Sequence, residues 1–260
     1  MIYIAKKLNW FLVTTLLASL TLVGCSKKDP QLKEEGELPQ DFKDSNLGHY
    51  SGVMVGSTGY YNLLLRTSGA KATVLFDGKK YELQRNSPIS ARQRVENLRL
   101  SDGNLSIIFN VDEEGKNPNI SISIPGHTIA ATIAKWEENN FVTNYIGSSK
   151  STYLDATDVT TYNMTVKGDT YQVIGKNDDG TYTETGKIMF YEDNRVKIIS
   201  KETTIEANHD PATGNITHFE SGPDNFSLEI KLNRQQLLFD ESGNPNEEYN
   251  WASPTMPPGG

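Results

Sequence analysis

Four histidines are the first residues in this chain that could do metal or acid–base chemistry. They lie far apart, at positions 49, 127, 209 and 218, and none has the short spacing of a zinc site. His209 and His218 flank the turn-forming residues 211–214, so a hairpin could bring the two side chains together. Two surface histidines beside a turn are the simpler interpretation.

Runs of oxygen-bearing side chains could in principle bind calcium. They occur at 112–117, 177–179 and 240–248, but none has the fixed acidic positions and intervening glycine of a calcium loop. We therefore predict no metal and no cofactor for this chain.

Catalytic motifs are also missing from the sequence. The 33 acidic residues make pairs of carboxylates unavoidable, so no pair is diagnostic of a glycosidase. Residues 52–56 read G-V-M-V-G, and no G-x-S-x-G nucleophile elbow occurs. There is no phosphate-binding loop or dinucleotide fingerprint. We expect a protein that is not an enzyme and assign no catalytic residue.

The one residue whose context does indicate chemistry is Cys25, the only cysteine. Two basic residues, Lys6 and Lys7, precede an apolar stretch at 10–23, which ends in Leu-Val-Gly-Cys at 22–25. The apolar stretch is too short to cross a bilayer, which needs about 20 residues. A basic start, an apolar centre and small residues at the end are typical of a secretory signal.

Leu22-Val23-Gly24-Cys25 resembles the lipobox of bacterial lipoproteins of the Gram-negative envelope. The resemblance covers residues 1–25 only. It implies that 1–24 are a signal peptide that is removed, that Cys25 is lipidated, and that this lipid makes the membrane a partner. Several acyl chains on one residue would form a lasting anchor. Ser26 favours the outer membrane, with the periplasmic or surface face left open.

Residues 25–47 combine the lipidated Cys25 with a polar, proline-containing stretch that is expected to be a disordered tether. The net charge of the chain is −8. Nucleic-acid binding needs a basic footprint, so we predict no nucleic-acid partner. An envelope protein or a glycan remains open as a partner.

From residue 48 onward, apolar and polar residues alternate. The alternation is clear at 120–124, 162–166 and 226–232, and at 105–111 it is broken only by Ile108. Successive side chains of a strand face opposite sides of its sheet, so this period predicts half-buried strands. Asp77-Gly78 and Asp102-Gly103 separate such runs and favour type I′ hairpin turns.

This pattern predicts an all-β, antiparallel fold built from hairpins, either a sandwich or a barrel. Two successive β modules at 48–147 and 148–239, or one body containing both, fit the number of strands. The Ser-Pro start at 87–88 predicts at most one short helix near 88–94. Residues 240–260 read as a loose C-terminal tail.

Three functions remain open at this stage. The first is a non-catalytic binding or scaffold module of the envelope, in which tyrosines could stack on sugars or anchor an interface. The second is a lipocalin-like carrier of a small apolar ligand. The third is an envelope hydrolase whose site is invisible in the sequence. The first explains most features of the sequence.

Overall fold

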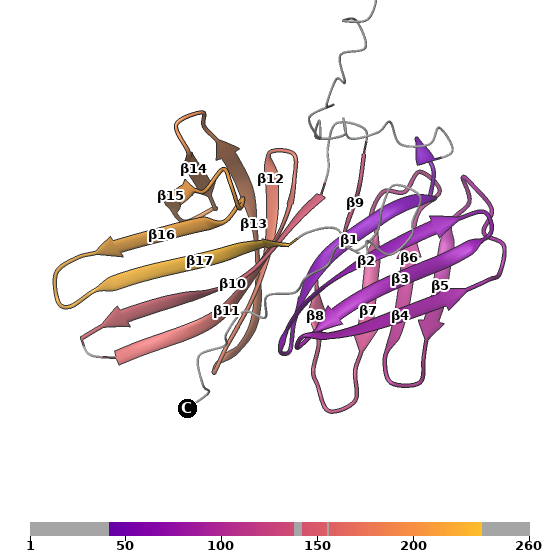
Figure 1. Cartoon of the computed structure of the whole chain (residues 1–260), viewed down its shortest axis with the longest axis horizontal. Helices are drawn as coiled ribbons and strands as arrows, with labels where there is room; N and C mark the ends of the chain where they lie inside the picture. The colour runs from indigo at the N-terminus through magenta and orange to yellow at the C-terminus, as the bar shows by residue number, and fades with distance from the viewer. Residues whose placement is uncertain (1–41, 138–141, 155, 236–260) are drawn as a thin grey trace, which may run out of the picture. The chain divides into compact units, whose positions relative to one another are not determined.

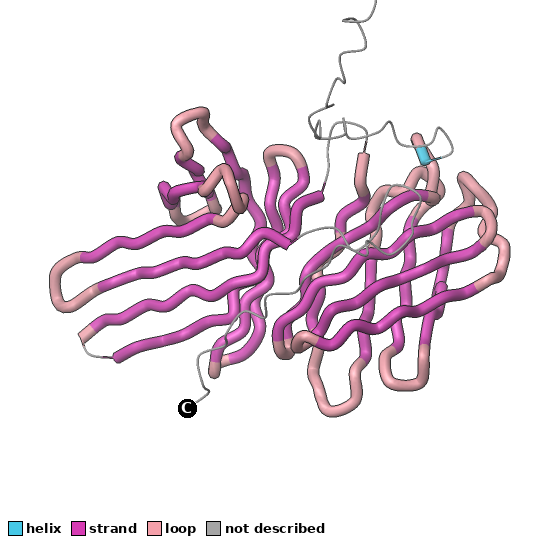
Figure 2. The backbone as a smooth tube through the Cα atoms, viewed as in Figure 1, coloured by secondary structure: helices cyan, strands magenta, loops and turns pink. Residues whose placement is uncertain are grey.

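A computed structural model describes residues 42–137, 142–154 and 156–235. Apart from a one-residue helical segment at Phe42, the regular structure in these ranges is all β-strand (Figure 2). The predicted all-β, antiparallel fold is therefore confirmed. Within the same ranges, no helix is long and apolar enough to cross a bilayer. All described residues belong to one compact unit.

The N-terminal half forms two antiparallel sheets (Figure 1). The larger has the strand order β4-β3-β2-β1-β8, with β9 also pairing β1, and the smaller has the order β5-β6-β7. The strands are β1 (Gly48–Val55), β2 (Thr58–Arg66), β3 (Gly69–Phe76), β4 (Lys79–Arg85), β5 (Val95–Ser101), β6 (Ser106–Val111), β7 (Asn119–Ser123), β8 (Ala130–Ala131) and β9 (Ala134–Lys135).

One apolar core joins these two sheets. The rings of Tyr50 on β1 and Phe109 on β6 meet edge to face, with centroids 4.9 Å apart. The Tyr50 hydroxyl donates a hydrogen bond to the carbonyl oxygen of Asn46 (2.7 Å), so this polar atom is buried with a partner. Lys135 is also buried, and its ammonium group donates to the carbonyl oxygens of Phe42 and Ser45. These bonds tie the first described residues to β9.

Hairpin chemistry explains the sharp turn between β3 and β4. Asp77 and Gly78 have φ values of 50° and 72°, the positive values that both central residues of a type I′ turn need. The turn between β5 and β6 is longer. There the Asp102 carboxylate accepts hydrogen bonds from the backbone N–H groups of Asn104 and Leu105, and these bonds lower its pKa.

The segment near 88–94 forms turns, and the short helix that the sequence allowed there does not form. Arg92 has a φ of 56°, which is incompatible with a right-handed helix. The side chain of Asn46 holds this conformation by donating to the carbonyl oxygen of Ser90 and accepting from the N–H of Arg92. A residue distant in sequence thus overrides the local helix signal.

The C-terminal half is a closed barrel of eight antiparallel strands, in which each strand pairs the next and β17 pairs β10 (Figure 1). Positions 147 and 148, where the sequence placed a module boundary, both lie inside β10. The strands are β10 (Val142–Tyr153), β11 (Ala156–Lys167), β12 (Thr170–Asn177), β13 (Gly180–Phe190), β14 (Arg195–Ile199), β15 (Thr204–His209), β16 (Ile216–Ser221) and β17 (Ser227–Gln235).

The outer wall of the barrel packs on the larger sheet. Ile146 and Ile174 of the barrel share an apolar cluster with four side chains of the sheet: Val53, Val55, Tyr60 and Leu75. Beside this cluster, the buried amide of Asn163 donates from Nδ2 to the carbonyl oxygen of Met54 (2.8 Å). Its Oδ1 accepts from the N–H of Gly147 (3.1 Å). Apolar contacts and hydrogen bonds together connect the two halves.

Candidate binding site in the barrel

The inward face of the barrel changes from apolar to polar along the strands. Near the end where the β11–β12 and β13–β14 turns lie, the interior is a core whose members include Val166, Ile188, Val196, Ile216 and Leu232. Toward the other end, where the β10–β11 and β12–β13 turns lie, the inward faces of β11 and β13 carry the polar side chains Asp158, Thr160, Tyr182 and Glu184, and Tyr162 lies at the edge of the core. Alternation along each strand gives both sets the same orientation.

Glu184 and Tyr171 form the central contact of this polar region. The Tyr171 hydroxyl donates to Oε1 of Glu184 at 2.6 Å. Tyr171 lies opposite Gly186 on β13, and its ring occupies the space that a side chain at position 186 would need. The missing side chain therefore lets the tyrosine ring lie flat against the neighbouring strand and reach the carboxylate.

A second glycine, farther along the strands, also leaves space for a tyrosine ring. Gly175 lies between Tyr162 on β11 and Tyr182 on β13 in the strand register. The Tyr182 ring covers Gly175, and any Cβ there would overlap it. Tyr162 is 7% exposed and Tyr182 is 39% exposed, so this row runs from the barrel interior to solvent.

The electrostatic field of this region is negative. Burial raises the pKa of Tyr162, Tyr171 and Tyr182, and Glu184 raises all three pKa values further. Asp158 adds to the increase in the pKa of Tyr182. Within the described ranges, no lysine, arginine or histidine forms an ion pair with either carboxylate.

His218 faces the interior from another wall of the barrel. Its Nδ1 donates to the carbonyl oxygen of Glu206 (2.8 Å), where the backbone pairing of β15 and β16 has ended. Its Nε2 is buried without a hydrogen bond in the described structure and lies 3.7 Å from the Glu220 carboxylate. The geometry offers hydrogen-bonding and charged groups that could hold a polar ligand.

The other histidines have structural neighbours. His49 lies between the rings of Phe42 and Trp136, His127 contacts Phe76, and His209 contacts Phe190. His209 and His218 thus have different partners. Within the described residues, no group of three or more histidine, cysteine, aspartate or glutamate side chains could hold a metal ion. Cys25 lies outside the described residues.

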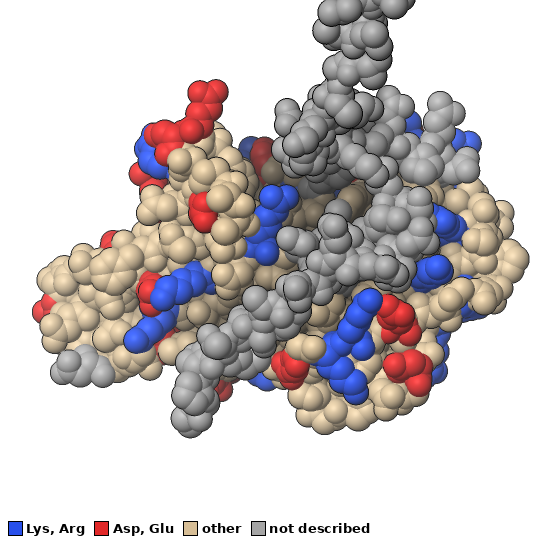
Figure 3. Space-filling model, in the orientation of Figure 1, with Lys and Arg blue, Asp and Glu red and all other residues tan. Residues whose placement is uncertain are grey.

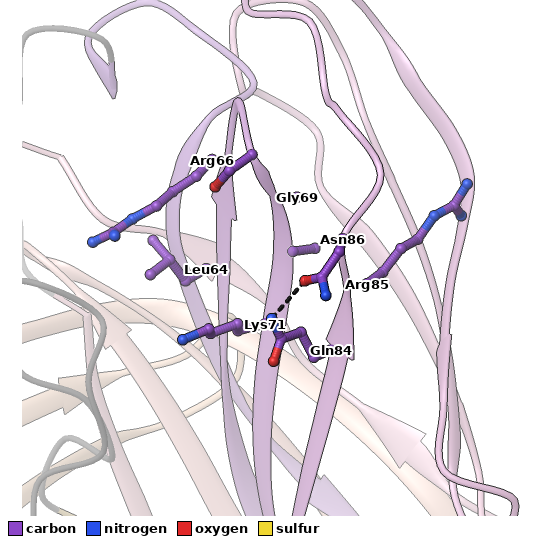
Figure 4. Close-up of a pocket in the computed structure, with 9 residues that line it drawn as sticks. Leu64, Arg66, Gly69, Lys71, Gln84, Arg85 and Asn86 are labelled. Carbon is purple, nitrogen blue, oxygen red and sulfur yellow. Dashed lines mark hydrogen bonds between the residues drawn. The ribbon is translucent and has the colours of Figure 1, made fainter.

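A hollow lies elsewhere, at the end of β2, β3 and β4. Its volume is about 140 Å³, below the roughly 300 Å³ at which small-molecule pockets begin. It is lined by Arg66, Lys71 and Arg85, but Figure 4 shows Arg85 extending away from the other two. On the face drawn in Figure 3, acidic and basic side chains are interspersed. Neither view shows cations converging on one site.

Sequence reasoning missed the tyrosine–carboxylate site, although one signal was present. In the stretch 182–186, Tyr182, Glu184 and Gly186 alternate with threonines and so occupy one face of a strand. The alternation does not tell which face points into a barrel.

No family model matches the chain, and a search of curated proteins finds no similar sequence.

Proposed function

We propose that this protein is a lipoprotein of the bacterial cell envelope, anchored in the outer membrane through lipid on Cys25, whose β body is a non-catalytic binding module. The Leu-Val-Gly-Cys motif after a basic and apolar start supports the anchor. The tyrosine–carboxylate region at the polar end of the barrel supports binding. This region is the single observation that carries the binding function.

The polar region is built to hold a ligand at the end of the barrel. Tyr182 and Glu184 are both partly exposed, so a ligand could reach them from solvent. Glu184 uses one oxygen for Tyr171, and no described residue donates to its other oxygen. Aromatic faces beside a carboxylate can contact a ligand by stacking and by hydrogen bonding together.

A lipocalin-like carrier of a small apolar ligand is the second candidate. The closed antiparallel barrel of eight strands is compatible with such a fold, and barrels of this size can enclose one small ligand. In this barrel, buried side chains such as Tyr145, Met164 and Val173 occupy the apolar half. We therefore favour binding at the polar end over enclosure within the apolar half.

The anchor is tested by labelling cells with radioactive palmitate. We expect the full-length protein to incorporate the label and to remain in carbonate-washed outer membranes. Cys25→Ala should lose the label, because no other cysteine is present. Gln31→Ala, in the expected tether, should behave as the original protein does. If the wild-type protein is not labelled, or if the Cys25→Ala variant is labelled, the proposed lipid anchor on Cys25 is wrong.

The binding function is tested by fluorine NMR of full-length protein labelled with 3-fluorotyrosine. Choline, glucose and octanoate serve as probes, and Tyr182→Phe assigns the Tyr182 signal. A shift of this signal with choline or glucose supports binding at the polar end. A shift of the interior Tyr145 with octanoate alone would favour the carrier instead. If no tyrosine signal shifts with any of the three probes, both the binding at the polar end and the carrier function are contradicted.

A further inference from the structure

We propose that Tyr162 and Tyr182, together with Asp158 and with Glu184 held in place by Tyr171, bind the ammonium group of an organic cation. The inference rests on the proposed binding function and names the class of ligand for that site.

Charge is the first argument. Glu184 and Asp158 are the carboxylates nearest to the tyrosine row, and neither forms an ion pair with a described residue. The lysines on these strands are directed elsewhere. Lys187 lies near Asp169, Lys167 pairs with Glu137, and Lys176 lies on the outward face of β12. Glu184 is partly buried and Asp158 is exposed, so solvent screens the charge of Glu184 less than that of Asp158, and Glu184 is the stronger attraction for a cation.

The tyrosine rings are the second argument, independent of the first. The negative face of an aromatic ring attracts a cation within about 6 Å, and several rings around a carboxylate are suited to alkylated ammonium groups. The Tyr182 ring is fixed over Gly175, and the Tyr171 ring is fixed over Gly186. The exposed Tyr182 ring and the buried Tyr171 ring therefore keep their positions without a ligand. Tyr182 can offer its ring to the cation, and Tyr171 keeps Glu184 in place, which lowers the entropic cost of binding.

The Tyr162 hydroxyl is the third argument. Tyr162 is only 7% exposed. Its hydroxyl forms no hydrogen bond with any described residue. Glu184 and Tyr182 are both close enough to affect its ionisation. Because the hydroxyl is not one of the fully enclosed polar atoms of the described structure, a ligand that enters the row can reach it and supply the missing partner.

An ammonium group fits these residues better than a metal ion does. A metal site needs more ligating side chains than two carboxylates, and the described residues contain no such group. A neutral polyol could use the hydroxyls, but it would leave the two carboxylates without a counter-charge. A cation with alkyl substituents satisfies both the carboxylates and the ring faces.

The test is calorimetric titration of the full-length protein in a non-ionic detergent with choline and with its neutral isostere 3,3-dimethylbutan-1-ol. We expect choline to bind and the neutral isostere to bind at least about tenfold more weakly, because only choline carries the charge. Equal binding of the two compounds would overturn the cation but leave a binding site. Absence of choline binding, with glucose binding at Tyr182 retained, would likewise overturn only this inference.

Variants locate the site. Glu184→Gln keeps an oxygen acceptor for Tyr171 and removes the charge, so we expect choline affinity to fall by about tenfold or more. Glu229→Gln, on the outer wall beside Lys231, is the matched control and should not change affinity. Tyr182→Phe should retain binding, because the ring face remains, whereas Tyr182→Leu should weaken it. An effect of Glu229→Gln equal to that of Glu184→Gln would refute the location.

Discussion

Replacing Asn163 by alanine is the sharpest test of how the barrel is held on the sheet. Asn163 is fully buried, and its amide bridges two backbone groups that are distant in sequence. Nδ2 donates to the carbonyl oxygen of Met54, and Oδ1 accepts from the N–H of Gly147. Asn163→Ala removes both bonds, and with them a longer one from Nδ2 to Oγ1 of Thr58 (3.4 Å), while leaving the backbone of the strands in place.

The expected cost follows from the two groups left without partners. A buried backbone group that loses its hydrogen bond costs about 1–3 kcal/mol, so two cost about 2–6 kcal/mol before any water enters. Water that enters between the barrel and the sheet would reduce this cost to about 2–4 kcal/mol. For a chain of this size, about 1 kcal/mol lowers the melting temperature by about 2–4 °C. The variant should therefore melt well below the original protein.

The assay is urea denaturation of residues 26–260, followed by circular dichroism. Thr161→Ala, on the same face of β11, has no side-chain hydrogen bond in the described structure and is the matched control. It should change the free energy of unfolding by less than about 0.5 kcal/mol. If Asn163→Ala changes the free energy of unfolding as little as Thr161→Ala does, the Asn163 amide does not hold the two halves together and this reasoning fails.

Two further predictions concern the barrel itself. Gly147→Ala should destabilise barrel closure by more than about 4 kcal/mol, because its Cβ would overlap the carbonyl oxygen of Lys231 across the seam between β10 and β17. Thermal melting measures this, with Ser149→Ala as the mild control, and an unchanged melt would contradict the strand register. Burial raises the pKa of Tyr145 from 10.0 to about 12, although Arg234 lowers it slightly. Because the folded pKa is the higher one, this stabilisation is complete below pH 10 and is lost as the pH rises toward 12. Absorbance at 295 nm follows tyrosine ionisation, and the difference from Tyr145→Phe isolates the signal of Tyr145. We expect Tyr145 to ionise above pH 10 in the folded protein. Ionisation near pH 10 would contradict this prediction.

Local features of the sequence predicted the elements of this fold well. Alternation identified strands such as 105–111 and 162–166, because a half-buried strand must place every second side chain in the core. Asp77-Gly78 identified a type I′ hairpin, because few other residue pairs accept positive φ at both positions. These properties depend on neighbouring residues only, so they are readable without the tertiary structure.

Contacts between distant residues decided the rest. The segment near 88–94 lacks its helix because the side chain of Asn46 binds its backbone. Barrel closure depends on the pairing of β10 with β17, and no local pattern encodes such a pairing. The candidate site depends on the register of β11, β12 and β13, because that register places Tyr162 and Tyr182 on either side of Gly175. The sequence by itself determined where the strands and turns form and which motif precedes Cys25. Only the tertiary structure decided which strand faces meet, because pairing between distant strands is selected by the packing of the whole chain.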